Sequence, residues 1–71
     1  MIKNPFTLKT QRAIEKYGAD TCMHAFERNR KDGEGPAMIG YNLGLSVMQA
    51  NAAINAGEEI EAWRQKVCSK V

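Results

Sequence analysis

A pair of short helices separated by an immediate glycine turn is the pattern that most limits how this chain can fold. Two such helices can cross steeply with almost no connector only under three conditions. A small residue must lie at the crossing, a residue tolerant of positive φ must make the turn, and a cap must start the second helix at once. Gly40, Gly44 and Ser46 occupy these three places in order. We therefore predict a helix-turn-helix over about residues 36–56.

The sequence around the turn also indicates where both helices begin and end. Pro36 suits the first position of the first helix, because an N–H at that position has no partner within a helix. Ser46 and Gln49 have the spacing of a capping box, in which the serine accepts from the third amide and the glutamine reaches back. We expect the second helix to span 47–56 and to end at Gly57.

Further helices are expected outside this motif. The first ends at Gly18, and the second runs from a cap at Asp20 to about Lys31. A last helix over 58–70 begins with acidic residues and ends with basic ones, as the helix dipole favours. No sustained two-residue alternation of apolar and polar residues indicates a strand. The expected fold class is all-α, a small bundle of about five helices that forms a single domain over residues 1–71.

The composition fits a small globular domain and restricts its function. The 71 residues are 44% hydrophobic and 25% charged. The net charge of +2 is compatible with nucleic-acid binding but does not require it. No apolar run approaches the roughly 20 residues of a membrane span, and the first residues lack the apolar run of a signal peptide. We therefore expect a cytoplasmic protein with no membrane partner.

No grouping of residues indicates catalysis or metal binding. Cys22 and Cys68 are far apart in the sequence and form no Cys-x-x-Cys pair. A single histidine, His24, leaves too few ligands for a tetrahedral zinc site. The glycine loop at 33–35 lacks the lysine and the flanking strand of a nucleotide-binding loop. We expect two reduced cysteines, no metal, no cofactor and no enzymatic activity.

The residues across and after the turn have a pattern that is known from a protein family. The chain reads Leu-Gly-Leu at 43–45 and Asn-Ala-Ala-Ile-Asn-Ala-Gly at 51–57. Together with the first motif helix, these stretches cover roughly a third of the chain. They resemble the helix-turn-helix of phage lambda-type Cro and repressor proteins. The resemblance implies a small sequence-specific transcriptional regulator, encoded by a phage or prophage. Such a protein binds double-stranded DNA as a homodimer and acts by occupying an operator.

The resemblance also implies roles for individual residues, because the second motif helix would enter the major groove. The expected base contacts are the residues on its outward side: Val47, Met48, Gln49, Asn51, Ala52 and Asn55. The amides among them can pair with adenine through two hydrogen bonds, and the apolar residues can contact a thymine methyl. The expected phosphate contacts lie on the motif and on the basic cluster before the glycine loop: Tyr41, Asn42, Ser46, Arg28, Arg30 and Lys31.

The absence of charge from the second motif helix leaves a different function open. Arginine to guanine is the commonest specific base contact, and 47–56 contains no arginine. Phosphate attraction would have to come from the cluster at 28–31 or, with less support, from one of the scattered basic residues Lys3, Lys9, Arg12, Arg64, Lys66 and Lys70. An exposed Met48 also suits a protein-binding surface. The main alternative is a small helical protein-interaction module, such as a phage-encoded inhibitor of a host protein. A third possibility is a helix-turn-helix used inside a larger assembly, such as a packaging or replication complex.

The apolar stripe of the last helix also has two interpretations. Ile60, Trp63 and Val67 recur at helical spacing, so they lie along one side of the helix. Trp63 with Ile60 fits either the protein core or the surface at which two copies meet.

Overall fold

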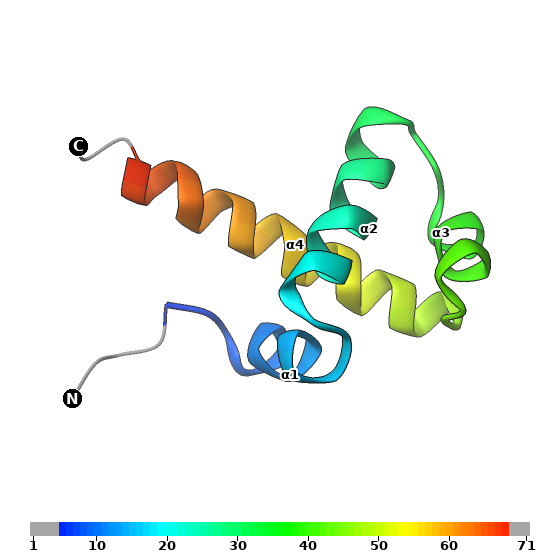
Figure 1. Ribbon diagram of the computed structural model, residues 1–71, viewed down its shortest axis with the longest axis horizontal. Helices are drawn as coiled ribbons and strands as arrows, with labels where there is room; N and C mark the ends of the chain where they lie inside the picture. The colour runs from blue at the N-terminus through cyan, green and yellow to red at the C-terminus, as the bar shows by residue number, and fades with distance from the viewer. Residues whose placement is uncertain (1–4, 69–71) are drawn as a thin grey trace.

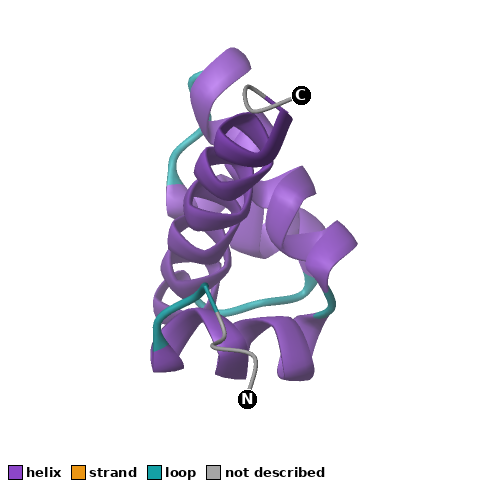
Figure 2. Cartoon of the chain, turned by 90° about the vertical axis from the view of Figure 1, so that its left-hand side faces the viewer, coloured by secondary structure: helices purple, strands orange, loops and turns teal. Residues whose placement is uncertain are grey.

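The computed structural model describes residues 5–68, which form four helices (Figure 1). In chain order they are α1 (Leu8–Tyr17), α2 (Ala19–Lys31), α3 (Pro36–Leu43) and α4 (Val47–Cys68). This described part consists of helices and loops and contains no strand (Figure 2), which confirms the all-α class. None of its helices combines the length and the apolar character that crossing a membrane requires.

The ends of α1 and the start of α2 follow from residues close by in the sequence. Thr7 caps α1, since its hydroxyl accepts a hydrogen bond from the backbone N–H of Thr10. Gly18 ends α1 with a φ of 89°, a conformation that residues with a side chain rarely adopt. Its carbonyl also accepts from the N–H of Cys22 at 3.2 Å, so it starts α2 as well. The predicted cap at Asp20 is therefore wrong, because α2 has already begun and Asp20 lies within its first turn.

A three-residue turn joins α3 to α4. Gly44 ends α3 in the left-handed conformation, with φ 72° and ψ 30°. Ser46 and Gln49 form the predicted capping box. The N–H of Gln49 donates to Ser46 Oγ at 3.1 Å, and the N–H of Ser46 donates to Gln49 Oε1 at 2.9 Å. A Cβ on Gly40 would lie 2.5 Å from the carbonyl oxygen of Leu45, so a larger residue would push α3 away from the turn.

α4 is one continuous helix where the sequence predicted two, so residues 5–68 contain four helices instead of about five. Gly57, the expected cap, lies buried inside α4. A Cβ at this position would collide with the carbonyl oxygen of Cys22 and the side chain of Phe26 on α2. The prediction of a helix end is wrong because this glycine allows two helices to approach closely.

The core consists mainly of small side chains, which lets the helices pack at short distance. α4 runs through the middle of the molecule and has its most extensive contacts with α2, while α1 and α3 also pack against it (Figure 1). Half of the buried hydrophobic residues are alanines. The full set is Ala13, Cys22, Met23, Ala25, Ile39, Ala50, Ala53, Ile54, Ala56 and Ile60.

Candidate functional site

The first half of α4 presents an uncharged surface to solvent. Five of the six residues expected to contact bases are exposed: Val47, Met48, Asn51, Ala52 and Asn55. The sixth, Gln49, is half-buried, and its side-chain oxygen is held by the backbone N–H of Ser46. The opposite side of the same turns is buried in the core through Ala50, Ala53 and Ile54. Packing therefore fixes which residues of α4 are available to a partner.

A groove of about 490 Å³ runs between this surface and α1. Its α4 wall consists of Met48, Asn51, Ala52, Asn55 and Ala56. Its α1 wall combines three basic residues with three others, and comprises Lys9, Arg12, Lys16, Thr10, Ala13 and Tyr17. The fold thus places a cationic row directly beside the uncharged surface of α4, although the two are far apart in the sequence.

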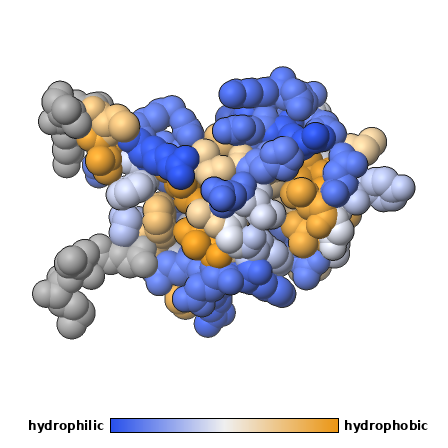
Figure 3. Space-filling view, viewed as in Figure 1, coloured by the Kyte–Doolittle hydropathy of each residue, from blue (hydrophilic) through white to orange (hydrophobic). Residues whose placement is uncertain are grey.

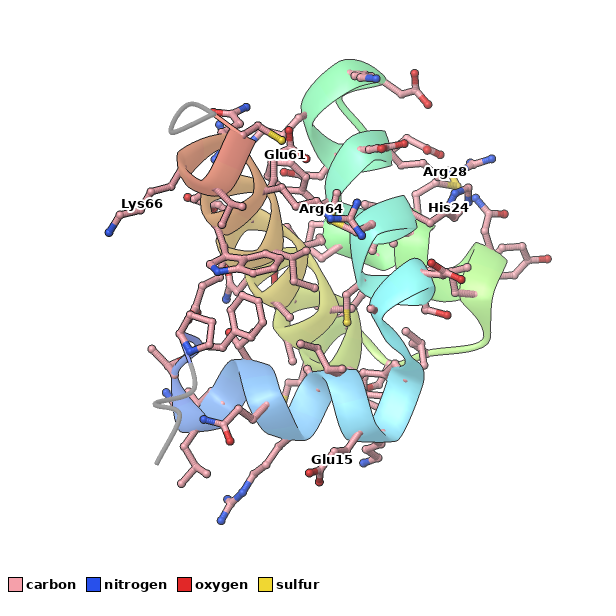
Figure 4. All side chains as sticks on the ribbon, turned by 60° about the vertical axis from the view of Figure 1, so that its left-hand side comes forward. Glu15, His24, Arg28, Glu61, Arg64 and Lys66 are labelled. Carbon is pink, nitrogen blue, oxygen red and sulfur yellow. The ribbon has the colours of Figure 1, made fainter. Side chains whose placement is uncertain are left out.

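Helical spacing explains why the three cations share one wall of the groove. Residues three and four positions apart lie on the same side of an α-helix, and Lys9, Arg12 and Lys16 have this spacing. Glu15 is only three positions from Arg12, but it is not among the residues that line the groove, and its side chain points away from the body of the molecule (Figure 4). Among the described residues that line the groove, none carries a carboxylate. We name Lys9, Arg12 and Lys16 the α1 basic row.

The basic cluster expected on α2 is largely paired with acidic residues. Arg28 forms an ion pair with Glu34, in which Nη1 and Oε2 are 3.0 Å apart. Arg30 forms another with Glu58 of α4, in which Nη2 and Oε2 are 3.2 Å apart. Lys31 is exposed. Two of the three expected phosphate contacts on α2 therefore have their charge offset by a neighbouring carboxylate.

The remaining expected phosphate contacts lie at the corner between α3 and α4. Tyr41 is 85% exposed, and Asn42 and Ser46 are exposed as well. Ser46 accepts from the N–H of Gln49, and its hydroxyl proton remains able to donate. The first turn of α4 adds backbone N–H groups that favour a negative charge. The corner therefore offers neutral hydrogen-bond donors.

The titratable residues of 5–68 form no cluster of the kind that holds a metal ion. His24 is exposed, and its Nε2 accepts a hydrogen bond from Nε of Arg28 at 3.1 Å (Figure 4). Cys22 is fully buried, and burial raises the pKa of its thiol. Cys68 is exposed, and both cysteines are free thiols. The surface that has the features of a binding site is therefore the groove with the first half of α4.

Lys16 lines this groove but is not among the residues that the sequence predicts as contacts for a partner. The helical spacing of the α1 basic row is visible in the sequence, but its position beside α4 depends on how the helices pack. The chain has no significant match among protein-family models, curated proteins or solved structures.

Proposed function

We propose that this protein binds double-stranded DNA sequence-specifically, with α3 and α4 as a helix-turn-helix and the first half of α4 in the major groove. Three features of the corner support this geometry: the left-handed Gly44, the capping box at Ser46 and the close approach at Gly40. Each favours a steep crossing of two helices that are joined by a short turn. The resemblance to phage Cro and repressor proteins, which rests on residues 43–45 and 51–57, leads us to propose a phage or prophage transcriptional regulator that acts by occupying an operator.

The observation that carries the proposal is the position of the α1 basic row beside the uncharged, exposed surface of the first half of α4. Asn51 and Asn55 can both donate to and accept from base edges, and Met48 or Ala52 can contact a thymine methyl. The major groove is about 12 Å wide and admits an α-helix. Such a helix can read bases without charge of its own when cations beside it attract the phosphates.

Asn51→Ala tests the reading role of α4. We expect the variant to lose about 1–3 kcal/mol of discrimination at one base pair, which is the contribution of a good bidentate contact. Selection from randomised duplexes identifies the preferred site, and fluorescence anisotropy on that site and on its single-base variants measures the loss. Gln65→Ala is the matched control, because Gln65 is an exposed amide on the far half of α4. An unchanged preference in Asn51→Ala would remove this residue from the readout.

Homodimerisation is the second part of the proposal. Helix-turn-helix proteins commonly bind two half-sites as dimers. Trp63 and Val67 are 41% and 45% exposed on the last turns of α4, and Figure 3 shows hydrophobic residues at this end of the molecule. Trp63, which fits either the core or a dimer surface, contacts Phe6 edge-on with ring centroids 5.7 Å apart. A second copy packed here would bury the side chains of Trp63 and Val67. The added buried area would stabilise the protein, because a chain of 71 residues has only a small core.

A protein-interaction module is the alternative, and large exposed side chains favour it. Tyr41, Met48 and Met38 are 85%, 82% and 53% exposed near the corner between α3 and α4. Methionine is adaptable and common on surfaces that bind proteins. A DNA-binding protein loses affinity steeply as salt rises. If the protein binds no duplex at about 50 mM salt, the DNA proposal is contradicted. An inhibitor of a host protein is then the better interpretation.

A further inference from the structure

We propose that the α1 basic row is the site that holds the phosphate backbone of the DNA. This inference rests on the proposed function and makes it more specific: α4 reads the bases, while Lys9, Arg12 and Lys16 hold the strand that borders the same major groove. The groove between the two helices would then receive that strand.

The distribution of charge is the first reason for this assignment. Contacts with phosphates supply most of the affinity of non-specific DNA binding, and they come from lysine and arginine. The first half of α4 supplies none of these residues, and Arg28 and Arg30 of α2 are paired with carboxylates. Within residues 5–68, no carboxylate forms an ion pair with any member of the α1 basic row. Lys16 Nζ lies over the Tyr17 ring, 5.6 Å from its centroid, a contact that does not neutralise the charge. The charges of the row are thus available to an anionic partner.

The dimensions of the groove are the second reason. Lys9 and Lys16 are separated by seven positions, which is about 10 Å along a helix. The same length covers about three base pairs at a rise of 3.4 Å each. Ala13 on one wall and Ala52 on the other are short and leave space between the helices. The long, flexible side chains of the three cations can therefore each reach a phosphate of one strand over this length while the α4 wall faces the bases.

The neighbouring acids do not oppose an anionic ligand at this wall. Glu15 is three positions from Arg12, but it does not line the groove, and it points away from the body of the molecule (Figure 4). Glu59 lies beside Thr10 at the N-terminal end of α1, where its carboxylate accepts hydrogen bonds from Thr7 and Thr10. A linear polyanion can thus follow the row without meeting an unpaired carboxylate in the groove.

The test replaces all three cations with glutamine: Lys9→Gln, Arg12→Gln and Lys16→Gln in one variant. Binding to a fluorescent random duplex is measured by anisotropy between 50 and 300 mM KCl. The slope of log K against log salt falls by about 0.9 for each lost phosphate contact, so we expect a decrease of about 2.7. Affinity at 0.1 M salt should drop by about eightfold per contact. Arg12→Gln alone, with an expected decrease of about 0.9, covers the case in which the triple variant fails to fold.

Arg64→Gln is the matched control, because Arg64 is exposed on α4 outside the groove. We expect its slope to equal that of the unsubstituted protein, and circular dichroism should show equal helix content in all variants. A further variant replaces Arg28, Arg30 and Lys31 with glutamine. If this variant lowers the salt slope while the α1 variants keep the original slope, the inference is overturned and the proposed function stands. If poly-glutamate displaces the duplex at equal charge concentration, the site binds anions in general and the inference is overturned. If the unsubstituted protein binds no duplex, both proposals are overturned.

Discussion

Glu59 connects the beginning of α1 to the middle of α4. Its carboxylate accepts from the backbone N–H of Thr7 at 2.6 Å, from the Thr7 hydroxyl at 3.1 Å and from the Thr10 hydroxyl at 2.5 Å. Burial acts to raise the pKa of Glu59, but the hydrogen bonds from Thr10 and Thr7 together outweigh it and lower the pKa below the ordinary 4.5. The ionised form therefore stabilises the contact between the two helices.

This lowered pKa predicts how stability changes with pH. The contribution of Glu59 is complete above the unfolded-state pKa near 4.5 and is lost as the pH falls through the lower folded-state pKa. We expect Glu59→Gln to reduce the free energy of unfolding by about 1 kcal/mol at pH 7, the order of a solvent-screened hydrogen bond. The difference from the unsubstituted protein should shrink as the pH falls below 4.5. Urea unfolding at pH 7 and at acidic pH measures both effects.

Glu15→Gln is the control for net charge, since Glu15 is exposed and makes the same change of charge. We expect little effect from it at either pH. An equal loss of stability in Glu15→Gln would assign the effect to overall charge and contradict the specific role of Glu59.

Local sequence signals predict the ends of helices well when the interacting residues are close in the sequence. They fail when a residue from another helix determines the role of the position. Gly44, Ser46 and Gln49 act on one another within a few residues, so their pattern alone locates the turn. Gly57 gives the same local signal as a capping glycine, but its role is set by Cys22 on another helix. The groove is unpredictable for the same reason, since no local pattern shows that α1 packs beside the first half of α4.

Gly57→Ala tests the close packing of α2 on α4. On helix propensity alone, alanine inside a helix stabilises it by about 1 kcal/mol relative to glycine. The added methyl group collides with the backbone of Cys22, so we expect instead a loss of about 2–3 kcal/mol. This loss lowers Tm by roughly 10 °C or more in a domain of this size.

Ala62→Gly provides the comparison on the same helix, because Ala62 is exposed. It should cost about 1 kcal/mol through propensity alone. Thermal unfolding followed by circular dichroism ranks the two variants. A Gly57→Ala protein that is more stable than the original would show that the helices have room for the methyl group, contrary to the packing described above.

Across the whole molecule, α4 carries two surfaces of different character at its two ends. Its first half borders the groove, and its last turns expose Trp63 and Val67. A helix of 22 residues is about 33 Å long, close to the longest extent of the molecule, 37 Å. Association of two copies through the last turns would leave both grooves open. DNA reading and dimerisation should therefore respond to separate substitutions.

Val67→Glu is the substitution that we expect to prevent dimerisation without changing the surface that reads DNA. In a symmetric dimer formed through this end, the two new carboxylates would be brought close together, which opposes association. We expect a dimer for the unsubstituted protein and a monomer for the variant in sedimentation velocity. Met38→Glu, at an exposed apolar residue of α3, should leave the dimer intact, because α3 lies at the opposite end of the molecule from the last turns of α4 (Figure 1).

The same variant then shows what dimerisation contributes to DNA binding. Linking two reading helices raises the affinity for a two-half-site operator by about 10²–10⁴ over one half-site. Val67→Glu should lose this gain on the full operator and keep the affinity of the unsubstituted protein for a single half-site. A variant that remains dimeric would remove Val67 from the interface. Because Val67 lies at the opposite end of α4 from Met48 and Asn51, a monomeric variant that also loses half-site binding would show that the two ends do not act independently.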